Sequence, residues 1–128
     1  GSRGRALALV GDGAMLMLHE LATAASHDVD ATWVVLNDGG MGMCRQGVDM
    51  LGISGIDADL APVRFAAMAA ALGVPSRVVE GAEQLDDVLR WAVRGTGPKL
   101  VEVPIDRGVT APIGARVAAL TWAGEASP

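Results

Sequence analysis

The stretch ALALVGDG at residues 6–13 decides the fold, because an unbroken apolar run ends in an acidic residue between two glycines. A second stretch, TWVVLNDGG at residues 32–40, repeats this form. Continuous apolar runs of this length are typical of parallel strands that are covered on both faces. Parallel strands end at one edge of their sheet, so we expect Asp12 and Asp38 to lie together there.

This sheet edge suits a particular kind of ligand. Carboxylate oxygens are preferred by Mg²⁺, whereas glycine-rich backbone at the start of a helix binds phosphate oxygens. Both kinds of group follow the two apolar runs, at Gly11, Asp12 and Gly13 and again at Asp38 and Gly40. The residues therefore favour a diphosphate that is held through Mg²⁺.

The rest of the chain alternates between helix and strand patterns. The sequence predicts an α/β fold, an open parallel sheet flanked by helices. We expect one domain over residues 1–128, with a core at about 5–106 and a tail at 107–128. The predicted strands cover residues 6–10, 32–36, 77–79 and 99–105. The predicted helices cover residues 15–26, 63–72 and 82–94, and residues 39–59 are expected to form a long loop with one short helix.

Composition narrows the class of protein. The 128 residues carry a net charge of −5, three tryptophans and one phenylalanine, which disfavours binding to nucleic acid. No apolar run approaches the ~20 residues of a membrane span, and no secretory signal is visible. A single cysteine, Cys44, fits a reducing compartment. We therefore expect a cytoplasmic protein that binds a small molecule, without membrane or nucleic-acid partners.

Several motifs together resemble a known family. LVGDGA at 9–14, ELATA at 20–24, WVVLNDGGMGM at 33–43 and GPKLVEV at 97–103 are similar to the diphosphate-binding C-terminal domain of thiamine diphosphate enzymes. The branch it resembles is the acetolactate-synthase-like one, which includes decarboxylases, oxidases and carboligases. The resemblance covers roughly residues 5–116.

The resemblance implies a role for each matching position. Asp12, Asp38 and the backbone carbonyl of Gly40 would bind Mg²⁺. Gly11, Gly13 and Ala14 would face the diphosphate, and Met41 and Met43 would contact the cofactor's rings.

Two features depart from the family pattern, one residue and one spacing. Position 38 is usually asparagine, so Asp38 adds a negative charge beside an anionic diphosphate. The spacing from Asp12 to Asp38 is also about one residue shorter than usual, which a change near residues 17–19 would absorb.

The resemblance also implies the activity. The whole enzyme would be a thiamine diphosphate-dependent lyase or transferase acting on a 2-oxo acid, with carboligation preferred over decarboxylation or oxidation. No catalytic residue is expected in this chain, because the glutamate that activates the cofactor belongs to a pyrimidine-binding domain. We expect that domain on a partner, in a homo- or hetero-oligomer. The chain would be either a fragment of a longer enzyme or a natural subunit of a split one.

Other interpretations stay open at this stage. A dinucleotide-binding site would need a third glycine where Leu16 stands. The chain could also be a non-catalytic interaction module derived from such a domain. Arg45 and Gln46 could face a substrate carboxylate or simply lie in a solvated loop, and the acidic residues could serve only as turn or helix-capping groups.

Overall fold

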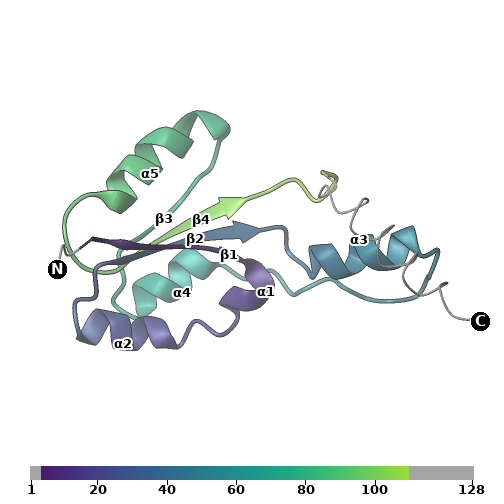
Figure 1. The fold of residues 1–128 in the computed structure, drawn as a ribbon, viewed down its shortest axis with the longest axis horizontal. Helices are drawn as coiled ribbons and strands as arrows, with labels where there is room; N and C mark the ends of the chain where they lie inside the picture. Colours follow the sequence, from purple (N-terminus) through teal and green to yellow (C-terminus); the bar gives the residue numbers. More distant parts are fainter. Residues whose placement is uncertain (1–3, 110–128) are drawn as a thin grey trace, which may run out of the picture.

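The core of the molecule is a sheet of four parallel strands. The computed structural model describes residues 4–109, so residues 110–128 of the predicted tail lie outside the described residues. The strands stand in the order β1-β2-β4-β3 (Figure 1). Their bounds are β1 (Ala6–Gly11), β2 (Ala31–Asn37), β3 (Ser76–Val78) and β4 (Lys99–Pro104). The predicted parallel sheet is confirmed.

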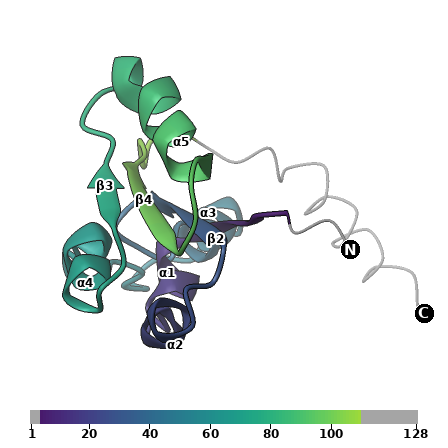
Figure 2. The same cartoon turned by 90° about the vertical axis from the view of Figure 1, so that its left-hand side faces the viewer.

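Helices cover both faces of the central strands of this sheet, as the end-on view makes clear (Figure 2). Leu7 and Leu9 of β1 are exposed, so the expectation that this strand is covered on both faces is wrong within the described residues. On one face α2 (Glu20–Ser26) and α4 (Phe65–Ala71) enclose a core that includes Leu21, Val35 and Phe65. On the other face α5 (Leu85–Val93), which follows the 3-10 turn η1 (Ala82–Gln84), packs on Val34 and Val101. Because both faces are covered, the central strand β2 is apolar on both sides, which explains its continuous hydrophobic run.

The predicted single helix at residues 15–26 is wrong in one respect. The chain forms a short helix α1 (Asp12–Met15), a turn over residues 16–19, and then α2. Met15, Leu18 and Leu21 are all buried in the same core. Their spacing does not reveal the break, because residues three apart lie on one face of a continuous helix as well.

The segment after β2 extends away from the sheet. It holds α3 (Gly42–Met50), which lies beyond the carboxyl ends of the strands (Figure 1). None of the residues of α3 is buried. The expectation of a long loop with one helix is confirmed, and the helix lies beside the edge where the acidic residues were expected.

The register of the strands brings three loops together. Gly11 of β1 pairs with Leu36 of β2, and Leu36 pairs with Val103 of β4. The strands therefore end at nearly the same level. The residues that follow them, Asp12, Asp38 and those after Pro104, must share one edge of the sheet.

The buried carboxylate of Glu102 holds the end of β2 in place through a hydrogen bond to Asn37. Glu102 is 5% exposed and accepts hydrogen bonds from Asn37 Nδ2 and from the Ala66 N–H, each at 2.8 Å. Ala66 lies in the first turn of α4, where backbone N–H groups have no partner within the helix. Glu102 thus caps α4 and holds the residue that immediately precedes Asp38.

Replacing Glu102 with alanine should destabilise the fold. The change leaves the buried Ala66 N–H without its acceptor and leaves Asn37 Nδ2 with only the Val63 carbonyl at 3.2 Å, which costs about 1–3 kcal/mol of unfolding free energy. Urea unfolding followed by circular dichroism measures the loss. Glu80→Ala is the matched control, because Glu80 is exposed. Equal stability of the two variants would contradict the capping role.

Candidate cofactor site

Asp12 is the buried centre of the site. Its side chain follows β1 directly and the residue is only 5% exposed. Its Oδ1 accepts a hydrogen bond from the Gly13 N–H at 2.8 Å, and its Oδ2 accepts one from the Gly40 N–H at 2.9 Å. Both donors are neutral, and within residues 4–109 Asp12 makes no ion pair. A buried carboxylate without a counter-ion is costly, so this position calls for a cation.

Asp38 comes to the same point from β2. Its Oδ1 lies 3.2 Å from the Gly40 nitrogen, so Asp12 and Asp38 share a single backbone donor. A tight turn makes this possible, because Gly39 has a φ of 70°, which glycine adopts readily. The sequence expectation that the two carboxylates meet at one sheet edge is confirmed.

Gly42 leaves room for the Asp38 carboxylate. A Cβ atom at position 42 would lie 2.0 Å from Asp38 Oδ2 and 3.1 Å from Asp38 Cγ. The glycine at the start of α3 is therefore needed for the observed position of the carboxylate, and not for an unusual backbone angle.

A cavity of about 520 Å³ opens beside these residues. It is lined by most of the residues predicted for the site, namely Gly11, Asp12, Gly13, Asp38, Gly40, Met41 and Met43. Ala14 does not line it, and the Gly13 N–H is bonded to Asp12 rather than directed at the cavity. The volume is that of a typical small-molecule site.

The sequence analysis missed one wall of the cavity. Ile105, Asp106 and Val109 line it, and all three follow β4. The signal was present, because β4 is parallel to β1 and β2 and must end at the same edge. Gln46 also lines the cavity, and its Nε2 donates to the Val109 carbonyl at 3.3 Å.

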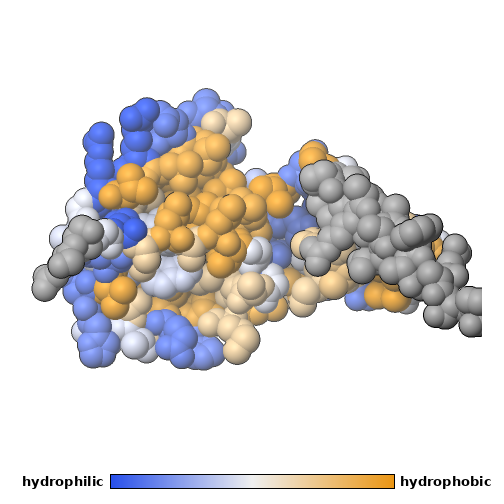
Figure 3. All heavy atoms as spheres, viewed as in Figure 1, coloured by the Kyte–Doolittle hydropathy of each residue, from blue (hydrophilic) through white to orange (hydrophobic). Residues whose placement is uncertain are grey.

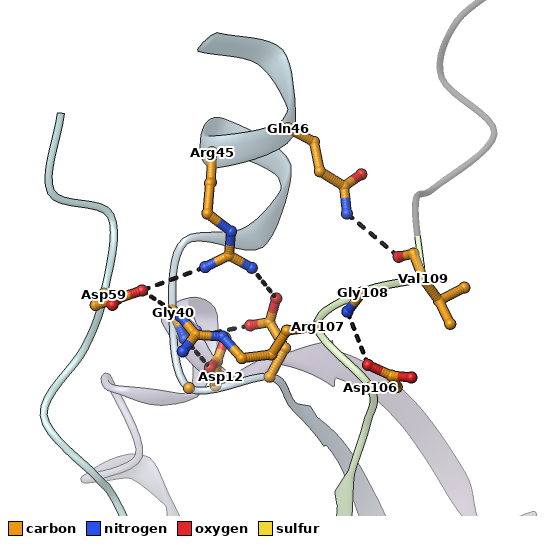
Figure 4. Close-up of polar contacts among 12 residues, drawn as sticks. Asp12, Gly40, Arg45, Gln46, Asp59, Asp106, Arg107, Gly108 and Val109 are labelled. Carbon is orange, nitrogen blue, oxygen red and sulfur yellow. Dashed lines mark hydrogen bonds and ion pairs between the residues drawn. The ribbon is translucent and has the colours of Figure 1, made fainter. Parts of the chain in front are cut away.

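Two arginines, Arg45 and Arg107, lie near Gly40 and Asp59 (Figure 4). Arg45 Nη2 lies 3.5 Å from Asp38 Oδ2, and Arg45 Nη1 lies 3.3 Å from Asp59 Oδ1. Arg107 Nη2 also donates to Asp59 Oδ1. The segment that carries Asp59 is tied to the turn by backbone bonds from Met41 N to Ala58 O at 2.7 Å and from Leu60 N to Gly39 O at 3.0 Å.

The donor set suits a hard divalent cation that brings further oxygen ligands. Among residues 4–109, no group of three or more His, Cys, Asp or Glu side chains is placed to hold a metal ion. Asp12 and Asp38 supply two carboxylates, and backbone carbonyls and a bound anion would have to complete the shell. Mg²⁺ is commonly bound in this way, through one or two carboxylates and the phosphates of its ligand.

Comparison with known proteins agrees with this geometry. Residues 2–103 match the family model for the thiamine pyrophosphate enzyme, C-terminal TPP binding domain. The chain therefore belongs to this family of thiamine diphosphate-binding domains. The predicted family is confirmed, and so is thiamine diphosphate as the cofactor that the family binds.

The individual relatives are much longer than this chain. The putative acetolactate synthase large subunit IlvB2 of Mycobacterium tuberculosis is 34% identical over 111 residues, which are 83% of this chain and 19% of that protein. Benzoylformate decarboxylase from Polynucleobacter necessarius has the same fold, with a TM-score of 0.78 and 21% identity over 83% of this chain and 20% of its own. A putative thiamin diphosphate-dependent enzyme isolated from Mycobacterium smegmatis gives a TM-score of 0.66 and 25% identity over 78% of this chain and 18% of its own. The chain spans about a fifth of the length of these relatives.

Gly42→Ala should abolish the site while keeping the fold. The new methyl group would displace the Asp38 carboxylate, so metal-dependent binding of thiamine diphosphate should fall by at least about tenfold, as expected for a lost charged contact. Calorimetric titration with the cofactor and Mg²⁺ measures this.

Gly47→Ala is the matched control in the same helix. A Cβ there meets nothing within 4 Å, and alanine should stabilise the helix by roughly 0.5–1 kcal/mol. Unchanged cofactor binding in Gly42→Ala would show that the observed position of Asp38 is not the binding position.

Proposed function

We propose that this chain anchors the diphosphate of thiamine diphosphate through Mg²⁺, in an enzyme that joins two carbonyl substrates, one of them a 2-oxo acid. The observation that carries the metal is the buried Asp12 carboxylate, which has no counter-ion among residues 4–109. The 34% identity to an acetolactate synthase large subunit supports carboligation. Such an enzyme is a lyase or transferase.

Each residue of the site has a defined task in this proposal. Asp12 and Asp38 would bind Mg²⁺ through one carboxylate oxygen each, and the Gly40 carbonyl would add a third ligand. Met41 and Met43, which line the cavity and are 42% and 66% exposed, would provide an apolar wall for the cofactor's rings. When bound, thiamine diphosphate supplies a nucleophilic carbon that attacks the carbonyl of a 2-oxo acid.

Decarboxylation and oxidation of 2-oxo acids stay as alternatives within the same superfamily. The metal site would serve all three reactions equally, because it holds the end of the cofactor that does not react. A non-catalytic interaction module is less consistent with the structure, since such a module has no use for a buried carboxylate that lacks a counter-ion in the described part of the chain.

The reaction would require a partner that holds the pyrimidine ring of the cofactor. We propose that this partner is a pyrimidine-binding domain or subunit, within a homo- or hetero-oligomer. Apolar surface gathers on the side of the molecule where β1 forms the sheet edge (Figure 3). Leu7 and Leu9 of β1 are 63% and 67% exposed, and such a surface is typical of an interface.

The location of the protein is part of the same proposal. Within residues 4–109 no helix is long and apolar enough to cross a membrane. The single cysteine fits a reducing compartment, so we place the enzyme in the cytoplasm.

Binding of thiamine diphosphate should require a divalent metal and the Asp12 carboxylate. At 100 times the dissociation constant, the cofactor with Mg²⁺ should add about 2.7 kcal/mol to the unfolding free energy of the chain, and EDTA should remove this gain. Asp12→Ala should show no gain. Thermal unfolding and calorimetry measure both effects.

The control for this experiment is Asp86→Ala, which removes an exposed carboxylate on the distant helix α5. It should respond to the cofactor like the unaltered chain. Equal affinity with and without Mg²⁺ would overturn the metal assignment.

The chain alone should not turn over pyruvate, and activity should require the pyrimidine-binding partner. The acidic side chains that line the cavity, Asp12, Asp38 and Asp106, lie at the sheet edge around the metal position, and none is expected to protonate the distant pyrimidine ring. Assays of CO₂ release with and without a separately produced pyrimidine-binding domain test this. Turnover by the purified monomeric chain would refute the need for a partner.

A further inference from the structure

Arg45 has an unusual position for a charged side chain. Its Nη2 atom is buried and has no hydrogen-bond partner within residues 4–109, and the carboxylate oxygen paired with it is Asp38 Oδ2 at 3.5 Å. The side chain is 25% exposed and that of Asp38 is 14% exposed. A partly desolvated charge pair of this kind is screened much less by water and salt than a surface pair.

Arg45 does not face the cavity. Asp38 and Gln46 line the cavity, whereas Arg45 does not. Its guanidinium contacts the carboxylates of Asp38 and Asp59, and Figure 4 shows it directed toward Asp59. Within the described residues, Arg45 therefore contacts Asp38 and Asp59 from outside the cavity wall.

The two oxygens of Asp38 have different surroundings. Oδ1 lies with Asp12 Oδ2 around the Gly40 N–H, on the side where the metal is proposed. Oδ2 lies beside the Arg45 guanidinium. One oxygen is thus available to a cation while the charge of the carboxylate is balanced from the other side.

The contact of Arg45 with Asp59 does not fully neutralise the charge of the guanidinium. Asp59 is 62% exposed and also accepts a hydrogen bond from Arg107. With two arginines around Asp59, the Arg45 charge remains available to Asp38. Glycine at position 40 allows the close approach of the Ala58 carbonyl, which would lie 2.8 Å from a Cβ there, and Arg45 Nη1 and Arg107 Nη2 would each lie 3.2 Å from it.

We propose that Arg45 is a positioning residue that neutralises Asp38 and directs one oxygen of it toward the metal. The inference rests on the proposed function. Together, Asp38 and Arg45 form a pair with no net charge that presents a single oxygen, as a neutral amide ligand would. Without Arg45, two carboxylate charges would offset the charge of Mg²⁺ and weaken its attraction for a diphosphate.

A double-mutant cycle tests this coupling. It compares the unaltered chain with Arg45→Met, Asp38→Asn and the double variant, because methionine keeps a long straight side chain without the charge. Calorimetry gives the dissociation constant for thiamine diphosphate with Mg²⁺. Arg45→Met should weaken binding on the order of tenfold when Asp38 is present, and by less than about threefold when position 38 is asparagine. Asp38→Asn alone should keep or improve binding.

Arg107→Met is the matched control. Among the described residues Arg107 pairs with Asp59 but not with Asp38, so its loss should leave binding within about threefold of the unaltered chain. Equal losses from Arg45→Met in both backgrounds would overturn the proposal, since Arg45 would then act without Asp38. No loss in either background would overturn it too.

Thermal unfolding of the four ligand-free proteins gives an independent readout. Arg45→Met should lower the melting temperature more when position 38 is aspartate than when it is asparagine, because only the first case leaves a largely buried carboxylate unpaired. If the unaltered chain binds no thiamine diphosphate, the proposed function fails, and this unfolding cycle still decides the pairing. Additive shifts of the melting temperature would then overturn it.

Discussion

The hydrogen bond from the Gly40 N–H to Asp12 Oδ2, at 2.9 Å, is the contact on which the site depends. It joins the residue after β1 to the turn after β2, and the same N–H also lies 3.2 Å from Asp38 Oδ1. A single donor thus holds two carboxylates close together, which like charges would otherwise resist. The backbone N–H lowers this repulsion only in part, so the arrangement keeps its demand for a cation.

Neighbouring residues hold the partners of this hydrogen bond in place. Glu102 fastens Asn37 and the start of α4, and Gly42 leaves the space that the Asp38 carboxylate fills. The segment at Ala58 and Leu60 closes over the turn through backbone hydrogen bonds. Each of these groups lies outside the proposed metal shell. The geometry of the site therefore comes from the packing of the sheet and its helices as much as from the two acidic residues.

Membership in the thiamine pyrophosphate enzyme family gives this electrostatic arrangement a use. In our proposal two carboxylates would attract Mg²⁺, but each additional negative charge would disfavour the diphosphate that the metal would hold. An acidic residue at position 38 makes that balance harder, and the arginine beside it offers a physical solution. The chain covers about a fifth of its relatives, and in our proposal the groups that select the substrates belong largely to the partner.

The sequence by itself determined the parallel sheet and the edge where Asp12 and Asp38 meet, because an apolar run that ends in glycine and aspartate can be recognised within a short stretch of chain. The same short motifs determined the family. It could not predict the break between α1 and α2, since the spacing of Met15, Leu18 and Leu21 fits one face of a continuous helix equally well. It also missed Asp106 and the pairing of Arg45 with Asp38. The spatial neighbours of a side chain depend on strand order and register, and only the tertiary structure decides those.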